Sequence, residues 1–228
     1  MNLYGHCGMN SIMDITGPFL KGEPYPLNFI PDEMKLEIAT RMAQSIENLH
    51  GVGVVHDDVH VDQWLLRRVP QSGSVPKDDS SKTFVHDYEV VLNDMNTAEF
   101  LRWNATSNEN YCTYYTSFGG HYRSPEEYIG SEVDVSTDIW PYGGLLFSLI
   151  TGLYPYYNET SDTVIQNLTV QGIPPYLSPM YYNRSYIEHH MIDIMNGCFH
   201  LDPNKRLSIQ EIVRKLQEMK VQITKQTS

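Results

Sequence analysis

The stretch VVHDDVHVDQWLL, residues 54–66, constrains the fold more than any other part of the chain. Its two ends are apolar and favour burial, whereas the eight residues between them include three aspartates and two histidines. The fold must therefore bury both ends in the core while the charged loop between them (residues 56–63) lies at the surface or in a polar site. Three interpretations of this charged loop compete: a metal site, a solvated turn, and a catalytic loop that holds a carboxylate at a fixed place.

Helical periodicity dominates the rest of the chain. The segments with apolar residues at helical spacing are 33–50, about 137–150, near 185–197 and 209–219. Ser208 and Glu211 form a capping-box pattern at the start of the last segment. Residues 84–93 are typical of a strand, whereas 97–121 show no clear period and are expected to be irregular. We therefore expect an α+β fold, mostly α, with its β-structure around residues 54–94.

Charge, cysteines and hydropathy narrow the classes of partner and compartment. The formal net charge of −12 argues against nucleic acid as a partner, because phosphate binding needs clustered lysines and arginines. Cys7, Cys112 and Cys198 lack the spacing of a zinc site or a disulfide framework, so we expect buried free thiols in a reducing compartment, with the cytoplasm as the default location. The longest uncharged run, 140–158, contains two prolines and paired glycines, which favours a buried helix over a membrane span.

Two aspartates stand where two expected strands meet loops. Asp58 lies in the charged loop, and Asp94 follows the expected strand 84–93. If the β-segments on either side pair, both carboxylates face a common space. Two neighbouring carboxylates can hold a magnesium ion and orient a hydroxyl group. Aspartates at strand ends are common, so this spacing alone leaves the three interpretations of the charged loop open.

Five segments, in order, resemble the motifs of protein kinase catalytic domains. The charged loop HDDVHVDQ resembles the catalytic loop H-R-D-L-x-x-x-N. The other four are NDMN in place of D-F-G, YRSPEEY in place of A-P-E, STDIWPYGGLLFSLITGLYPY in place of the central helix, and LDPNKRLSIQEIVRKL in place of the last element. The resemblance implies a protein kinase-like domain over residues 1–228. Residues 1–17 would be a remnant of the small-lobe sheet with the hinge, and 18–228 a helical large lobe.

The resemblance also implies an activity and a role for each matching residue. The activity is phosphoryl transfer from Mg-ATP to a hydroxyl group of a protein substrate, with serine and threonine favoured over tyrosine. The expected catalytic residues are Asp58, which accepts or orients the hydroxyl proton, with His60 and Gln63. The expected magnesium ligands are Asp94 and Gln63, and the expected nucleotide-binding residues are Met13, Asp14, Thr16, Leu65 and Asp94. The expected structural residues are His56 and Asp138, of which Asp138 would bind the backbone of the charged loop. Glu126 and Arg206 would form a buried ion pair.

The departures from the family pattern leave two alternatives open. Asp57 replaces an arginine that meets a phosphate on the activation segment, so we expect no activation by that route. His60 replaces a lysine, and as a neutral imidazole it would help the transferring phosphate less. No Gly-rich loop or strand lysine precedes residue 17, which suggests a truncated sequence or a chain that has lost these parts. The alternatives to a kinase are therefore a pseudokinase that acts as a binding module and an inert fragment.

Overall fold

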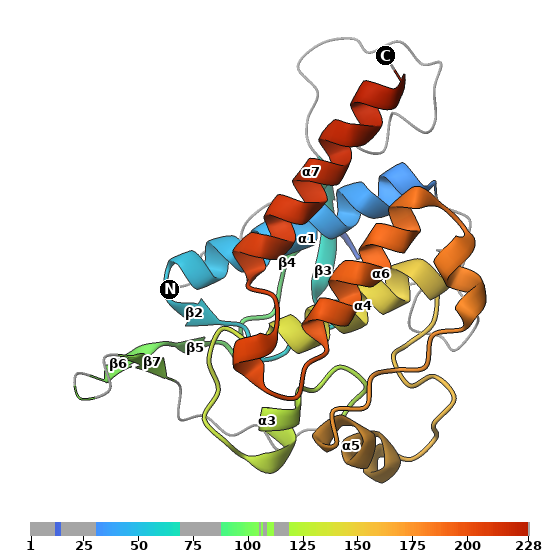
Figure 1. Cartoon of the computed structure of the whole chain (residues 1–228). Helices are drawn as coiled ribbons and strands as arrows, with labels where there is room; N and C mark the ends of the chain where they lie inside the picture. Colours follow the sequence, from blue (N-terminus) through green and yellow to red (C-terminus); the bar gives the residue numbers. More distant parts are fainter. Residues whose placement is uncertain are drawn as a thin grey trace.

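The computed structural model describes residues 12–14, 31–68, 88–104, 106, 109–111 and 119–227 of the 228-residue chain (Figure 1). Helices dominate the described part, and the protein has an α+β fold that is mostly α. The α-helices are α1 (Asp32–Gly51), α3 (Pro125–Ile129), α4 (Ile139–Thr151), α5 (Asp162–Val170), α6 (Tyr186–Cys198) and α7 (Ile209–Thr227). The strands are β1 (Ile12–Asp14), β2 (Val54–Val55), β3 (Trp64–Arg68), β4 (Tyr88–Leu92), β5 (Glu99–Phe100), β6 (Arg102–Asn104) and β7 (Glu109–Tyr111).

Helix α4 forms the centre of the hydrophobic core, and every one of its residues is buried. It contacts α6 and α1, and α7 packs along α1, so the apolar faces of the surrounding helices close over it. Gly144 lets the neighbouring chain come close, because a Cβ atom there would lie 2.8 Å from Cδ1 of Tyr122. The Tyr122 hydroxyl lies 2.8 Å from Oγ of Ser148 on the same helix. The core helix thus fixes Tyr122 at the edge of the candidate site.

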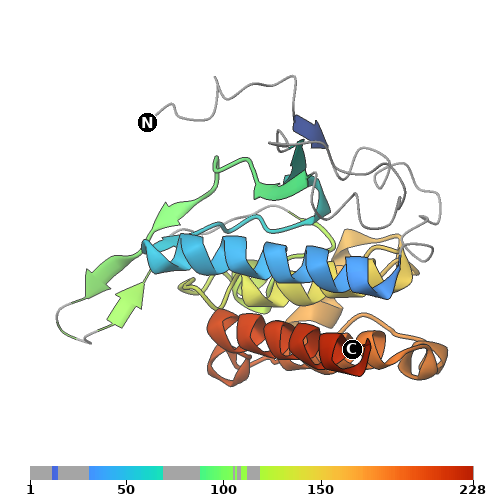
Figure 2. The same ribbon diagram turned by 90° about the horizontal axis from the view of Figure 1, so that it is seen from above.

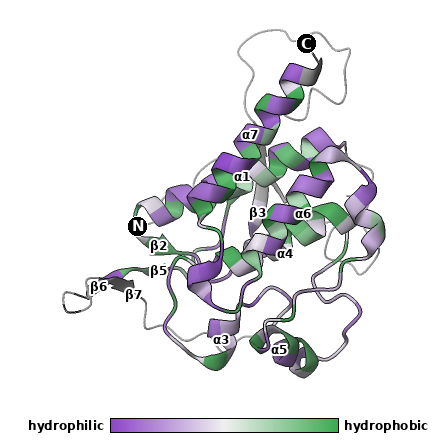
Figure 3. Cartoon of the chain, viewed as in Figure 1, coloured by the Kyte–Doolittle hydropathy of each residue, from purple (hydrophilic) through white to green (hydrophobic). Residues whose placement is uncertain are grey.

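Amphipathic helices surround this core. Figure 3 shows polar and apolar residues alternating along α1 and α7, as expected for helices with one face in the core and one in solvent. Cys198 is a buried free thiol at the end of α6, as the sequence predicts, whereas Cys7 and Cys112 lie outside the described residues. Among the described helices, none combines the length and apolar character that crossing a membrane requires.

The described strands form three small sheets. The sheet β1-β3-β4 is antiparallel, with Trp64 opposite Leu92, and Figure 2 places it on the side of α1 away from α7. Strand β2 pairs with β5, and β6 pairs with β7. The β3–β4 register brings the end of the charged loop beside the turn after β4, where the Asn93 N–H donates to the Gln63 carbonyl at 2.8 Å. Segments 30 residues apart in sequence therefore meet at one edge of this sheet.

The four helices expected from periodicity are confirmed, although the last extends eight residues beyond the expected end, to Thr227. One expectation was wrong. The capping box forms, because the Ser208 N–H donates to Oε2 of Glu211 at 2.8 Å and the Glu211 N–H donates to Oγ of Ser208 at 3.3 Å. Residues 97–121 were expected to be irregular, but they contain β5, β6 and β7. These strands are two or three residues long, too short to show alternation, and their pairing depends on partners rather than on local pattern.

Candidate active site

The charged loop is anchored from below by one carboxylate, that of Asp138. Its Oδ2 accepts the His56 N–H at 2.9 Å and its Oδ1 accepts the Asp57 N–H at 3.0 Å. His50 Nε2 donates to the same Oδ2 at 2.8 Å. Burial opposes ionisation of Asp138, but the hydrogen bond and charge of His50 and the contacts with His56 hold its pKa below the ordinary value. An ionised residue at the start of α4 therefore fixes two successive peptide units of the loop.

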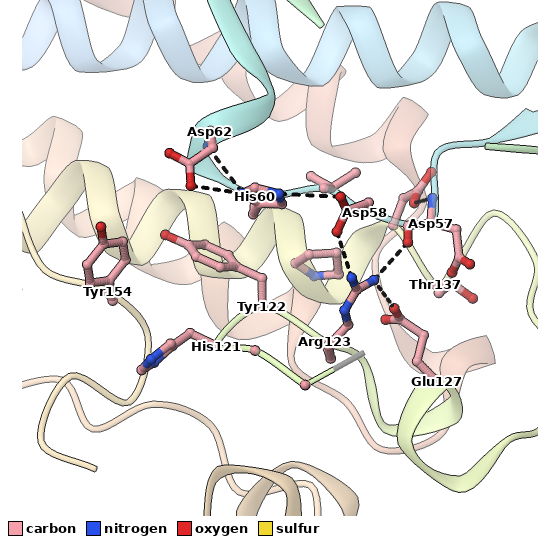
Figure 4. Close-up of a pocket in the computed structure, with 15 residues that line it drawn as sticks. Asp57, Asp58, His60, Asp62, His121, Tyr122, Arg123, Glu127, Thr137 and Tyr154 are labelled. Carbon is pink, nitrogen blue, oxygen red and sulfur yellow. Dashed lines mark hydrogen bonds and ion pairs between the residues drawn. The ribbon is translucent and has the colours of Figure 1, made fainter. Parts of the chain in front are cut away.

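The loop turns sharply at Asp57, which has a φ of 57°. Left-handed backbone is uncommon outside glycine, although aspartate adopts it more readily than most residues. Arg123 Nη1 donates to the Asp57 carbonyl at 2.8 Å and holds the turn from the opposite side. The following residue, Asp58, is thereby directed toward the segment 119–123, as Figure 4 shows.

The Asp58 carboxylate lies at the centre of a hydrogen-bonded cluster (Figure 4). Its Oδ1 accepts from Arg123 Nη2 at 2.7 Å, and its Oδ2 accepts from Gln63 Nε2 at 2.7 Å. His60 Nε2 lies 3.4 Å from the same Oδ2. Burial raises the pKa of Asp58, but His60, Arg123 and Gln63 outweigh burial and hold it below the ordinary value. Asp58 is therefore ionised at neutral pH.

His60 lies between two carboxylates, and this position changes its charge. Nε2 faces Asp58, while Nδ1 lies 3.5 Å from Oδ2 of Asp62. The Asp62 N–H also points at Nδ1, at 3.3 Å, but a peptide dipole at that distance is weaker than two full negative charges. Burial lowers the pKa of His60, yet the two carboxylates raise it to about 9. This shift favours the positively charged imidazolium over the neutral imidazole expected from the sequence, although Gln63 Nε2 lies 3.0 Å from the same His60 Nε2.

Arg123 is a site residue that the sequence did not single out. Besides Asp58 and the Asp57 carbonyl, its Nη1 donates to Oε1 of Glu127 at 2.7 Å. Glu127 is buried, and it closes the capping box of α3 by accepting the Ser124 N–H at 2.6 Å. The start of α3 is therefore tied to the charged loop. In the sequence, only its position next to the Ser-Pro-Glu motif, in a chain with few basic residues, could have indicated that Arg123 belongs to the site.

Asp94 lies on the turn after β4, which hydrogen bonds fasten to the charged loop. His56 Nε2 donates to the Asn93 carbonyl at 3.0 Å, and Thr97 Oγ1 donates to the His56 carbonyl at 3.2 Å. Asp94 itself is exposed and has a φ of 58°. The structure thus groups Asp58, His60 and Gln63 in one cluster and places the exposed carboxylate of Asp94 on the adjoining turn.

The remaining expected residues lie in two other places. In the sheet, Asp14 is the register partner of Leu65 and Met13 that of Leu66, while Thr16 lies outside the described residues. Away from the cluster, Glu126 and Arg206 form a buried pair with N–O distances of 2.5 and 2.7 Å, linking α3 to the segment before α7.

A cavity of about 320 Å³ opens beside Asp58. The charged loop forms one wall, and residues 119–123 with Tyr154 form the other, as drawn in Figure 4. We refer to this cavity as the Asp58 pocket. Tyr122, His121 and Tyr154 give it an aromatic side, with the His121 and Tyr154 ring centroids 5.8 Å apart. The pocket thus combines an ionised carboxylate, an imidazole between two carboxylates and aromatic rings.

The helical lobe, the anchored loop and its carboxylate are together the features of a protein kinase domain. The family model described as the protein kinase domain matches residues 25–216, so the chain belongs to the protein kinase family. The family acts on protein substrates and generally uses ATP and magnesium.

Curated relatives match at low identity. The chain is 23% identical over 197 residues to a probable serine/threonine-protein kinase of Dictyostelium discoideum, and 27% identical over 174 residues to human ribosomal protein S6 kinase alpha-3. It is 32% identical over 93 residues to a probable inactive serine/threonine-protein kinase of Dictyostelium discoideum. These matches cover 85%, 76% and 39% of this chain, but they cover only 12%, 21% and 10% of the relatives.

Proposed function

We propose that this chain carries the large lobe of a serine/threonine-protein kinase, which transfers the γ-phosphoryl group of Mg-ATP to a hydroxyl group of a protein. The observation that carries the proposal is the position of Asp58. It is ionised, it is held by Gln63 and Arg123, and it lines a pocket whose loop is fixed through Asp138. Positioning and electrostatics are what phosphoryl transfer requires of a protein.

Asp58 and His60 have complementary roles at the acceptor. The ionised Asp58 carboxylate accepts a hydrogen bond from the substrate hydroxyl and orients its oxygen for in-line attack. Its low pKa makes it a weak base, so orientation contributes more than early proton removal. The two neighbouring carboxylates raise the pKa of His60 to about 9 and so favour its cationic form, which would supply, 3.4 Å from Asp58, the positive charge that a lysine would otherwise supply to the transferring phosphoryl group.

Asp94 and Gln63 have the donor chemistry for magnesium. Asp94 offers an exposed carboxylate, and Gln63 turns its amide nitrogen toward Asp58, which leaves its amide oxygen for an ion. The part of the chain that the structure describes has no group of three or more His, Cys, Asp or Glu side chains that could hold a metal ion. A magnesium ion would therefore need nucleotide phosphates as further ligands, which is the usual arrangement for Mg-ATP. Bound magnesium would neutralise charge that develops on the phosphates.

A pseudokinase that binds without catalysis is the second candidate function. Both oxygens of Asp58 already have hydrogen-bond donors, Arg123 and Gln63, and a substrate hydroxyl must compete with them. The similarity to a probable inactive kinase points the same way. The two candidates differ in turnover and not in fold.

The test uses the protein as its native transcript encodes it. ATP binding is measured with and without magnesium, and phosphoryl transfer is followed with γ-labelled ATP and a mixture of Ser/Thr-containing peptides. For a kinase we expect magnesium-dependent binding and transfer, with Asp58→Asn lowering transfer by at least about 100-fold. Glu218→Gln, on the exposed face of α7, is the matched control and should change neither. Binding without transfer supports the binding module, and absence of both contradicts both candidates.

A further inference from the structure

A second and larger cavity lies outside the Asp58 pocket. Its volume is about 800 Å³, compared with about 320 Å³ for the Asp58 pocket. Its walls come from the end of α1, from segment 132–136 between α3 and α4, and from segment 203–211, where α7 begins; these elements can be followed in Figure 1. We refer to this cavity as the α7 groove. The two cavities share no lining residue, so the α7 groove is a separate candidate site.

Apolar side chains from two separate hydrophobic clusters line the α7 groove. Leu101 and Val135 pack against the small cluster formed by Val55 and Val133. Leu207 packs against the main core instead. All three of the packing side chains are only partly buried, and all three line the groove. The groove therefore follows the seam between the two clusters, and an apolar side chain placed in it would remove surface of both from water.

The acidic side chains of the α7 groove are not neutralised by neighbouring cations. Glu132, Asp134 and Glu211 line it, and within the described ranges no lysine or arginine forms an ion pair with any of them. Asp134 and Glu211 accept hydrogen bonds from neutral hydroxyl and peptide N–H groups, which hold the pKa of Glu211 below its ordinary value. Arg206 also lines the groove, but it is bound to Glu126. The groove therefore carries a surplus of negative charge that attracts cations.

A buried histidine adds an unused hydrogen-bond acceptor to this groove. The His50 side chain is 3% exposed and lines the groove, and its Nε2 donates to Oδ2 of Asp138 at 2.8 Å. In the neutral ring Nδ1 is then an acceptor, and it has no hydrogen-bond partner in the part of the chain that the structure describes. The two ring nitrogens point in widely different directions, so Nδ1 is turned away from Asp138. A buried acceptor without a donor is costly, which suits Nδ1 to an N–H group of a molecule in the groove.

These three features together select one class of ligand. The seam takes an apolar side chain, the carboxylates take a cation, and Nδ1 of His50 takes an N–H group. A polypeptide segment carries all three groups, whereas a metal ion has no apolar part and a nucleic acid has the wrong charge. We propose that the α7 groove docks a segment of a partner protein in which lysine or arginine residues flank aliphatic residues. This docking does not depend on phosphoryl transfer, because the α7 groove and the Asp58 pocket are separate.

The experiment selects peptides without assuming their sequence. A displayed library of random peptides is selected on the full protein, and the bound peptides are sequenced. We expect enrichment of sequences that combine lysine or arginine with leucine, isoleucine or valine. An enriched peptide is then synthesised with its basic residues replaced by glutamine, or with its aliphatic residues replaced by serine, and its Kd is measured by fluorescence anisotropy. Each replacement should weaken binding by about tenfold, and the effect of charge should shrink in high salt.

Variants of the protein assign the binding to the α7 groove. Glu132→Lys should weaken binding of the enriched peptide by about tenfold or more, and it changes an exposed residue, so the core stays intact. Val135→Ser, at the seam, should weaken it by about threefold. Glu218→Lys makes the same change of charge on an exposed part of α7 outside the groove, and it should alter the Kd by less than about twofold.

The outcomes separate this proposal from the kinase function. Selection that enriches no sequences with both basic and aliphatic residues would overturn the docking proposal. Equal binding to Glu132→Lys and Glu218→Lys would overturn it as well, because the peptide would then bind elsewhere. Peptide binding at the groove by a protein that transfers no phosphoryl group would contradict the kinase function and leave the docking proposal standing.

Discussion

The Glu126–Arg206 ion pair should contribute more to stability than any exposed ion pair of the chain. The Arg206 side chain is fully buried and donates to both oxygens of Glu126. Removing one partner of a buried pair costs about 3–5 kcal/mol, because the other charge is left uncompensated. Arg206 would keep the Ser136 and His200 carbonyls, at 2.8 and 2.9 Å, and the Trp140 ring 5.4 Å away. We therefore expect Glu126→Ala to cost about 3 kcal/mol, the lower end of that range.

Thermal and urea unfolding followed by circular dichroism would measure this cost. For a domain of this size about 3 kcal/mol corresponds to a fall in Tm of roughly 6–12 °C. Glu218→Ala is the control, because Glu218 pairs with Arg214 at 2.7 Å on an exposed face of α7, and its loss should cost no more than about 0.5 kcal/mol. The double replacement Glu126→Leu with Arg206→Met should recover most of the loss. A cost for Glu126→Ala below about 1 kcal/mol would refute the reasoning.

Three further predictions concern buried or partly buried residues. Asp57 has its pKa raised from 3.8 to about 8, so between these pH values the folded protein keeps a proton that the unfolded chain has released, and stability falls as pH rises. Asp57→Asn should remove this dependence, which unfolding at pH 5 and pH 8.5 would measure. Gly197→Ala should destabilise by about 1–3 kcal/mol, because a Cβ there lies 2.6 Å from Cδ1 of Leu207. Lys35→Met should cost about 3 kcal/mol by urea unfolding, because Nζ of the fully buried Lys35 lies 2.5 Å from Oε1 of the buried Glu188.

Each of these predictions has an outcome that contradicts it. If the free energy of unfolding depends on pH equally in Asp57→Asn and in the parent protein, groups other than Asp57 cause the dependence. Gly51→Ala, where nothing lies within 4 Å of the added Cβ, is the control for Gly197→Ala, and equal costs at the two positions would contradict the packing argument. A loss below about 1 kcal/mol in Lys35→Met would mean that Glu188 finds sufficient compensation from Arg184, 3.1 Å away.

Local sequence determines the parts of the fold that could be predicted. Helix α7 follows from its capping box and one apolar face, and Asp58, His60 and Gln63 meet because they are at most five residues apart in one loop. Arg123 is 65 residues from Asp58, so only the packing of α3 brings the two together. The pKa of His60 could not be predicted for a related reason, because its upward shift depends on the side-chain positions of Asp58 and Asp62.

Because Asp138 anchors the charged loop to the core, two peptide groups of this loop should be protected from hydrogen exchange as strongly as the core itself. The peptide hydrogens of His56 and Asp57 are both donated to a buried residue at the start of α4, the helix whose side chains are all buried. These hydrogens can exchange with solvent only when that contact opens, and opening it disturbs the most protected part of the core. The peptide hydrogens of His56 and Asp57 should therefore exchange with solvent at rates typical of the protein interior, although the loop that contains them lines the pocket.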